Sequence, residues 1–284
     1  MDKGRGVGGR LATRRIGDAV FDHGAQFFTV RTDEFASIVD EWLQAKVARE
    51  WCRGFAEHDG HPRYVGTAGM TSIAKHMARG MDVRTSTLAF TLRDKNGSLV
   101  VRTDDGDDHA ADTVILTAPT PQSFSFLMNI GRELPAELRG GEYVRTLGLL
   151  AVLDSDDHNV PAPGGVQNPD DTFQFIGDNK AKGISPVPAL TFHFSPEFSA
   201  AHYDDDPDEL HLLMRESVRE WCGSSRIIDS QVKKWRFATP QAVHPDRCWS
   251  THDGRVIVAG DAFAGPRVEA AVLSGLAAAA VVSE

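Results

Sequence analysis

RVIVAGDAFAGPRVEAAVLSGLAAAAVV, the stretch Arg255–Val282, predicts a β-strand, a turn and a helix in that order. Val256–Ala259 is a short apolar run rich in β-branched residues, and Gly260 ends it. A helix of small residues is expected to begin at about Val268. The turn therefore aims the N-terminus of a helix at whatever lies above Asp261.

The start of this helix has the chemistry of a binding site. The N–H groups of Val268, Glu269 and Ala270 have no partner inside the helix, and the positive end of the helix dipole lies beside them. Such a terminus attracts negative charge or electron-rich oxygen, and Asp261 can accept hydrogen bonds from sugar-like hydroxyls. A βα unit that only packs is the alternative, because Ala277–Ala280 would suit close contact with a sheet.

The segment resembles the C-terminal flavin motif of the FAD-dependent amine oxidase superfamily. Within that superfamily it is similar to the renalase-like branch, whose sequences end in a Gly-Asp turn followed by Arg-Val-Glu-Gly-Ala and Ser-Gly. Ala270 replaces the usual glycine, a difference of one methyl group. The resemblance implies FAD as cofactor, contacted here by Gly260, Asp261, Arg267, Val268 and Glu269.

Composition and charge limit the classes of partner. A chain of 284 residues with 41% hydrophobic and 25% charged residues is long enough for a substantial core. A net charge of −10 argues against nucleic acid and against an anionic membrane as the main partner. Cys52, Cys222 and Cys248 are too scattered for a disulfide framework. A small-molecule substrate remains the expected partner.

The sequence predicts neither a membrane span nor a signal segment. The last apolar run, Ala270–Val282, is shorter than the roughly 18 residues that a membrane span requires. The chain does not open with a basic and then apolar signal segment. A soluble protein with a cytoplasmic location is therefore expected.

The first ten residues contain a formal Gly-x-Gly-x-x-Gly at Gly4, Gly6 and Gly9. The match is weak because a dinucleotide fingerprint follows a strand, and only three residues precede Gly4. If the segment corresponds to a later family signature, a first strand, its phosphate-binding glycine turn and the first helix, about 30 residues in all, would lie upstream of Asp2. A late start codon, a shortened chain or a natural short form would each explain this.

The same segment resembles the family's second signature, in which an acidic residue precedes Gly-Gly-Arg. The resemblance implies that Asp2 binds the adenosine ribose through its two carboxylate oxygens. It also implies that Gly8 and Gly9 let the backbone approach the cofactor, and that Arg10 faces its phosphates or the flavin edge. A flexible N-terminus is the alternative interpretation.

Two further segments resemble cofactor contacts of the family. Asp22-His-Gly-Ala-Gln-Phe-Phe is similar to a segment whose backbone passes the flavin ring, which assigns Gln26 and Phe27 to the cofactor. Phe27 would equally suit the core, since neighbouring strand residues face opposite sides. Strands are expected over 82–92 and 98–102, joined by an Asn-Gly hairpin turn. The resemblance implies that the backbone near Ala89, in the first of them, meets the adenine.

Two residues are candidates for a place beside the reacting atoms. A strand over 189–195 puts His193 on the face opposite Phe192, and His193 matches a histidine of the renalase-like branch. Trp235, in a strand over 231–237, resembles a tryptophan that lies near the flavin in relatives. A hydrogen-bonded structural histidine and a buried strand tryptophan are the alternatives.

No metal site is expected. His58 and His61 lack a third ligand at a usable spacing. The acidic run over 104–108 lacks the ligand alternation of a calcium loop, so a solvated turn explains it better.

The expected fold is α/β with two lobes. The resemblance implies a Rossmann-like, glutathione-reductase-type FAD domain, N-terminally incomplete, and a mixed-sheet substrate domain. The FAD domain would comprise residues 1–36, 62–121 and 233–284, and the substrate domain residues 37–61 and 122–232. Helices are expected over 33–50, 119–135 and 207–221, with a loop over 51–61 and mostly loop over 154–188.

The chain contains no Gly-x-Ser-x-Gly elbow, no Walker loop and no His-Glu-x-x-His motif. The resemblance implies a renalase-like FAD oxidase that converts dihydronicotinamide isomers of NAD(P)H to the aromatic cofactor and reduces oxygen to peroxide. An ordinary FAD-dependent amine oxidase or a desaturase is the second hypothesis. A truncated homologue that does not retain FAD, and acts as a binding or structural protein, is the third.

Overall fold

The computed structural model of the chain describes residues 1–55, 59–139 and 141–283, and it has a mixed α/β fold. The helices are α1 (Asp33–Gln44), α2 (Thr71–Met77), α3 (Thr120–Asn129), α4 (Ala136–Arg139), α5 (Pro196–His202), α6 (Pro207–Ser217), α7 (Arg219–Cys222) and α8 (Val268–Ser283). The strands are β1 (Thr13–Ile16), β2 (Ala19–Asp22), β3 (Ala48–Cys52), β4 (Arg63–Gly66), β5 (Ala89–Lys95), β6 (Ser98–Thr103), β7 (Asp108–Ala111), β8 (Val114–Leu116), β9 (Tyr143–Leu153), β10 (Gly165–Gln167), β11 (Phe173–Asp178), β12 (Ala189–Phe194), β13 (Ile227–Pro240), β14 (Trp249–Ser250) and β15 (Val256–Val258).

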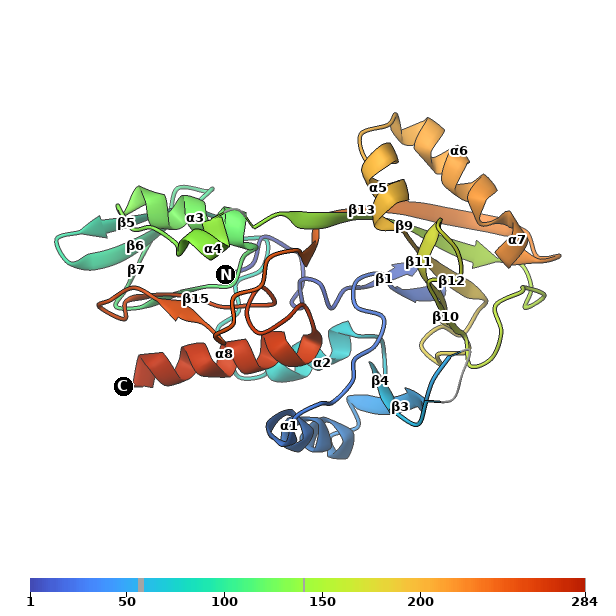
Figure 1. Ribbon diagram of the computed structural model, residues 1–284, viewed down its shortest axis with the longest axis horizontal. Coiled ribbons are helices and arrows are strands. Elements are labelled where there is room, and N and C mark those ends of the chain that lie inside the picture. Colours follow the sequence, from blue (N-terminus) through green and yellow to red (C-terminus); the bar gives the residue numbers. More distant parts are fainter. Residues whose placement is uncertain (56–58, 140, 284) are drawn as a thin grey trace.

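The largest sheet is antiparallel and has the strand order β10-β11-β12-β9-β13. Its two faces are covered by different elements, because successive strand residues point to opposite sides. Leu149 and Phe192 face a cluster with Met214 of α6, whereas Leu150 faces Phe21 of the β1–β2 hairpin. Helices α5 and α6 cover one face of this sheet, and β1 and β2 lie against the other (Figure 1).

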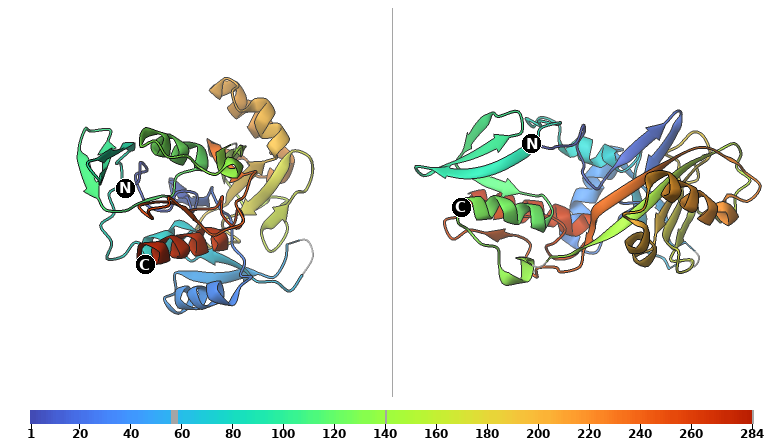
Figure 2. Two further views of the ribbon diagram at one scale, coloured as in Figure 1. Left: turned by 60° about the vertical axis from the view of Figure 1, so that its left-hand side comes forward. Right: turned by 90° about the horizontal axis from the view of Figure 1, so that it is seen from above.

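A second group of elements surrounds α8. Strand β15 pairs in parallel with β8 and antiparallel with the short β14, and the antiparallel strands β5, β6 and β7 form a separate sheet. Leu92, Leu127, Val258 and Phe263 are buried together between these strands and α3. The long strands β9 and β13 extend from the five-stranded sheet towards this group (Figures 1 and 2).

Helix α1 ends at Gln44, so the expectation of a helix over 33–50 followed by a loop was wrong at its C-terminal end. Thr32 caps the start by accepting a hydrogen bond from the N–H of Phe35. Lys46 has φ of 56°, which ends the helical path, and Ala48–Cys52 then pairs with β4. Pairing with a distant strand therefore outweighs the helical spacing of residues 47–50.

The strand expected over 82–92 begins only at Ala89. Upstream of it, the N–H of Asp2 donates to Arg84 O over 2.8 Å, so these residues pair with the N-terminus. The Asn96-Gly97 turn is confirmed, with φ of 52° and 82°, as a two-residue hairpin requires.

Several other elements differ from the expectation in their bounds, and two are confirmed. Strand β8 lies at the edge of its sheet, and its Ile115 is 41% exposed. The helix expected over 119–135 is shorter, and the one over 207–221 is divided into α6 and α7. Strands β10 and β11 lie inside the region expected to be mostly loop. Strand β13 and helix α8 are confirmed.

Candidate functional site

The N-terminal and C-terminal motifs meet through one ion pair. Both terminal nitrogens of the Arg10 guanidinium donate to the two carboxylate oxygens of Asp261. Arg10 Nη1 also lies 3.3 Å from Phe237 O and 3.2 Å from Ala238 O. A bidentate pair fixes both side chains in one orientation. Arg10 was expected to face the cofactor, and here it holds the Gly-Asp turn beside the Gly-Gly-Arg segment.

The Gly-Gly-Arg segment also lies directly against the segment that follows β2. The N–H of Ala25 donates to Arg10 O over 2.8 Å. A Cβ on Gly24 would lie 1.9 Å from the same oxygen, so this approach requires glycine. Gly8 and Gly9 have φ of 113° and 50°, a backbone region that favours glycine. Three stretches with family resemblance are therefore neighbours in space.

The first turn of α8 carries free donors. Among the residues that the structure describes, the N–H groups of Val268, Glu269 and Ala270 have no hydrogen-bond partner. The carboxylate of Glu269 is buried and accepts hydrogen bonds from Arg31 N, Thr32 N and Thr32 Oγ1 at 2.7–3.1 Å. That side chain therefore joins the start of α8 to the start of α1. Only the backbone of Glu269 is left to contact a cofactor.

The other members of the C-terminal motif are placed around this turn. Gly260 has φ of 138°, and its N–H donates to Ser274 Oγ over 2.8 Å. Arg267 is exposed, immediately before the helix. Free amides at a helix start, with an arginine beside them, fit an anionic or electron-rich group such as the edge of a flavin.

Asp2 lies beside the strand that contains Ala89. The N–H of Thr87 donates to Asp2 O over 2.9 Å, and β5 begins two residues later. One carboxylate oxygen of Asp2 accepts the N–H of Gly4 over 2.7 Å, so the other oxygen is the one left for a ribose hydroxyl. Residues 1–12 precede β1 and form no strand, in agreement with the weak match of Gly4–Gly9 to a dinucleotide fingerprint.

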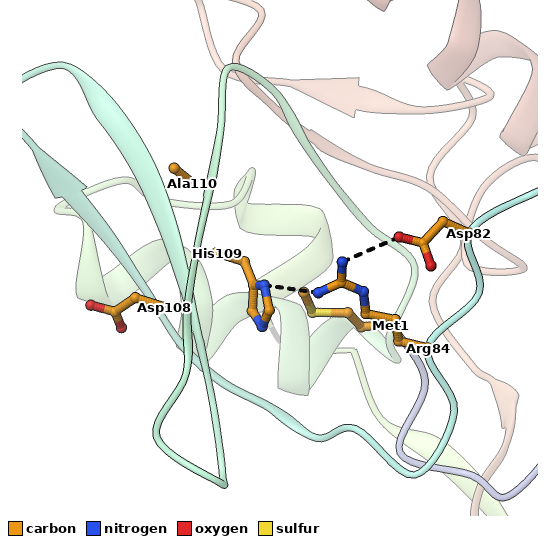
Figure 3. A pocket seen from close by; sticks show the side chains of 6 residues that line it. All are labelled: Met1, Asp82, Arg84, Asp108, His109 and Ala110. Atoms are coloured by element: carbon orange, nitrogen blue, oxygen red, sulfur yellow. Dashed lines mark hydrogen bonds and ion pairs between the residues drawn. The ribbon is translucent and has the colours of Figure 1, made fainter.

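A cavity that the sequence did not indicate opens next to this N-terminal segment (Figure 3). Arg84 lies at its centre, 3.2 Å from Asp82 and 3.0 Å from His109 Nδ1, with the side chain of Met1 alongside. These residues come from the chain start, the segment before β5, and β7. No local pattern could have joined them, because the contacts cross between separate parts of the chain.

His193 and Trp235 converge on one backbone carbonyl. His193 Nε2 lies 3.1 Å and Trp235 Nε1 lies 2.8 Å from His23 O. The His23 ring stacks on the Trp235 ring with 5.3 Å between centroids. Since a carbonyl only accepts, we assign the proton of neutral His193 to Nε2. The sequence did not indicate His23 as a site residue, yet its carbonyl connects His193 and Trp235.

Both histidines are held in the neutral form at pH 7. Burial lowers the pKa of His193 to about 4, and the positive charge of Lys182 acts in the same direction. Burial lowers the pKa of His23 to about 4 as well, with further contributions from Lys233, His193 and Arg14. His193 therefore serves as a fixed hydrogen-bond donor and carries no charge at neutral pH.

Gln26 belongs to a buried polar group that also contains Lys182 and Asp22. Lys182 is fully buried, with Nζ 3.3 Å from Asp22 Oδ2 and 3.1 Å from Gln26 Oε1. Gln26 Nε2 donates to Asp22 O over 2.7 Å. Burial lowers the pKa of Lys182, and Asp22 opposes that shift. The side chain of Gln26 thus points inward, so its backbone is what can face a cofactor.

Phe27 and Phe28 point to opposite sides, as neighbouring residues of an extended chain do. Phe28 is buried against Phe35 of α1, whereas Phe27 is half-buried. The ring of Phe27 packs on Phe55 and Phe175 with centroid distances of 5.3 Å and 5.9 Å. Phe27 is therefore part of an aromatic group beside Lys182, and Phe28 is the core residue.

Within the described ranges, no cluster of three His, Cys, Asp or Glu side chains could hold a metal ion. His58 lies outside those ranges. The described helices include none that is both long and apolar enough to cross a membrane.

Solved structures that share this fold include three oxidases. One is a putative protoporphyrinogen oxidase from Exiguobacterium sp. 255-15, with 13% identity and a TM-score of 0.56 over 78% of this chain and 52% of that one. Another is cyclohexylamine oxidase from Brevibacterium oxydans IH-35A, with 12% identity and a TM-score of 0.58 over 80% and 55%. The third is putrescine oxidase bound to putrescine, with 16% identity and a TM-score of 0.56 over 79% and 54%. The chain spans about half the length of these proteins.

The family assignment comes from the sequence match, because identities this low establish the fold alone. Residues 44–283, most of the chain, match the family described as flavin containing amine oxidoreductase. The free amides of α8 and the Asp2 carboxylate fit a cofactor with an electron-rich ring edge and a ribose, and the Arg10–Asp261 pair joins the N-terminal segment to the Gly-Asp turn. The chain therefore belongs to the flavin-containing amine oxidoreductase family, whose cofactor is FAD.

Proposed function

We propose that this protein is a renalase-like FAD-dependent oxidase that converts dihydronicotinamide isomers of NAD(P)H to the aromatic cofactor, with oxygen as electron acceptor. The observation that carries the proposal is the surroundings of Trp235. Its indole ring stacks on His23, and no Phe, Tyr or Trp of the described chain pairs with it. A tight aromatic cage, which would favour an ordinary amine substrate, is therefore not built at this position.

The chain's own residues have distinct tasks in this proposal. When bound, FAD supplies the two-electron redox chemistry. The amides of Val268 and Glu269 would face an electron-rich edge of the flavin, a contribution of roughly 0.3–1 kcal/mol and up to about 2 kcal/mol when partly buried. This tunes a redox potential without setting it. His193 and Trp235 would hold the His23 carbonyl still, beside the backbone of Gln26.

The second candidate is an amine oxidase, and a specific observation favours it. Trp51, Phe55 and Phe175 surround Phe27, and Lys182 Nζ lies 5.3 Å from the centre of the Trp51 ring. This group shows that an aromatic lining and a cation can lie together in this fold. Two of the structural neighbours are oxidases of cyclohexylamine and putrescine.

Oxygen consumption separates the candidates. The purified protein should take up FAD, show the visible absorption of a flavin, and consume oxygen with dihydronicotinamide isomers. Cyclohexylamine and putrescine should give no turnover above background. Turnover with the amines alone would overturn the proposal in favour of the second candidate. A colourless protein that takes up no FAD would establish the third hypothesis, a homologue without catalysis.

A further inference from the structure

Two cations lie side by side near the Trp235 ring. On β13, Gln231, Lys233 and Trp235 point to the same side of the sheet, towards the β1–β2 hairpin. Gln231 Oε1 accepts hydrogen bonds from Arg14 Nε over 2.8 Å and from Lys233 Nζ over 3.0 Å. One neutral amide oxygen thus holds an arginine and a lysine together.

These two charges lack an acidic partner. In the described residues, neither Arg14 nor Lys233 lies within ion-pair distance of a carboxylate. Burial lowers the pKa of Lys233, and the charge of Arg14 lowers it further. Uncompensated cations that are half-buried are unusual in a chain with a net charge of −10, because desolvation and mutual repulsion both act against them.

The register of the strands places the cations next to His193 and Trp235. Lys233 and His193 lie opposite Gly148 of β9 from its two sides, so the three form one row across the sheet. A Cβ on Gly148 would lie 3.5 Å from His193 Cδ2 and 3.7 Å from Lys233 Cβ. His23 Nδ1 is buried without a hydrogen-bond partner in the described chain. The charges of Lys233 and Arg14 both lower the pKa of His23. The row therefore places the positive charge of Lys233 close to His193 and Trp235.

We propose that Arg14 and Lys233, held by Gln231, form the binding site for a phosphate group of the substrate. Phosphate oxygens accept from the fork of an arginine and from a lysine ammonium at once. The same charges repel an ammonium substrate. The assignment of this phosphate to the substrate rests on the proposed function, whereas the anion site itself depends only on the geometry.

Calorimetric titration of the FAD-loaded protein with inorganic pyrophosphate tests the site directly. We expect saturable binding that Arg14→Gln or Lys233→Gln each weakens about tenfold or more, the loss expected for one charge-assisted hydrogen bond. Arg15→Gln and Lys234→Gln are matched controls, because these exposed neighbours lie on the same strands and change the net charge equally. Arg14→Lys and Lys233→Arg should recover most of the affinity.

Two results would overturn the site. Equal weakening by the control variants would show general charge attraction, and unchanged binding in the Arg14→Gln, Lys233→Gln double variant would show that the anion binds elsewhere. Circular dichroism of each variant checks that it folds. If pyrophosphate binds only without FAD, and added FAD displaces it, the site belongs to the cofactor phosphates and the substrate assignment is wrong.

Kinetics supply a separate test of the substrate assignment. Lys233→Gln should raise KM about tenfold or more for dihydronicotinamide isomers that carry phosphate. It should leave KM for the phosphate-free nucleoside unchanged. An equal effect on both substrates would contradict the assignment. A protein that binds pyrophosphate through Arg14 and Lys233 but oxidises no dihydronicotinamide would refute the proposed function and leave the anion site standing.

Discussion

Lys182 is the residue whose environment differs most from what its type suggests. A lysine is rarely fully buried, and here its ammonium lies between the Asp22 carboxylate and the Gln26 amide oxygen. The sequence indicated no partner for Lys182. Asp22 ends β2 and Gln26 follows it, 160 and 156 positions before Lys182, so no local pattern can reveal these partners.

Replacing Lys182 with methionine should destabilise the protein by about 3–5 kcal/mol, because Asp22 would keep a buried charge without its cation. Urea unfolding at pH 7 measures this difference. Lys180→Met is the control, since Lys180 is half-exposed and pairs with Asp156 at the surface, and it should change stability by about 0.5 kcal/mol or less. A loss below about 1 kcal/mol in Lys182→Met would contradict the role assigned to the buried pair.

The two neutral histidines make stability depend on pH in a definite direction. Burial lowers the pKa of His23 and of His193 to about 4, below the ordinary value of 6.5. Between these pH values the unfolded chain binds protons that the folded chain does not bind. Stability is therefore complete above about pH 6.5 and falls towards pH 4, by roughly 2–3 kcal/mol for each histidine.

Urea unfolding at pH 7 and pH 5 checks this expectation. The difference between the two pH values should shrink in His193→Gln. It should persist in His252→Gln, because His252 is exposed. An equal pH dependence in wild type and His193→Gln would show that His193 titrates in the same way in both states.

At the scale of elements, strong local sequence patterns were sufficient to predict helices, turns and strand faces. The helix from Val268, the Asn96-Gly97 hairpin and the opposite faces of β12 agree with the structure. The C-terminal end of α1 was missed. Helical spacing continues past Gln44, yet β4 recruits residues 48–52 into a sheet. A pairing partner more than ten residues away outweighs a weak local preference.

Gly24 lies against the backbone of another segment, whereas Gly275 of α8 has free space beside it. Gly24→Ala should unfold the protein or displace the Gly-Gly-Arg segment, because the added carbon would lie 1.9 Å from Arg10 O. Gly275 of α8 has nothing within 4 Å of a built Cβ, so Gly275→Ala should stabilise the protein by about 0.4–1 kcal/mol. Thermal unfolding of the two variants distinguishes these outcomes. A neutral Gly24→Ala would contradict the backbone contact.

At the scale of the whole molecule, the pair between Arg10 and Asp261 connects segments 251 positions apart. The two chain ends lie on the same side of the fold, beside β5–β7 and α8 (Figure 2). We propose that bound FAD contacts the Gly-Gly-Arg segment and the first turn of α8 together; this turn is the end of α8 opposite to the C-terminus. The division into an FAD domain and a substrate domain stays a prediction, and β13 crosses its boundary at residue 233.

Bound FAD should therefore stabilise the whole fold. At a concentration a hundred times its dissociation constant, a ligand that binds only the folded state adds about 2.7 kcal/mol. We expect FAD to raise the midpoint of thermal unfolding in wild type and to have a much smaller effect in Asp261→Asn. Asp18→Asn, at an exposed turn, should respond like wild type. An equal response of Asp261→Asn would exclude Asp261 from the cofactor site.

The sequence by itself determined the local elements and the family: the strand, turn and helix around Gly260, the hairpin, and the motifs at both chain ends. These depend on periodicity, capping and turn chemistry, which act over a few residues. Only the tertiary structure decided that Arg10 pairs with Asp261, that the Glu269 carboxylate is used inside the protein, and that Lys182 is buried. The choice of a partner for a charged side chain is made between residues far apart in the chain, so it becomes definite only when the fold brings them together.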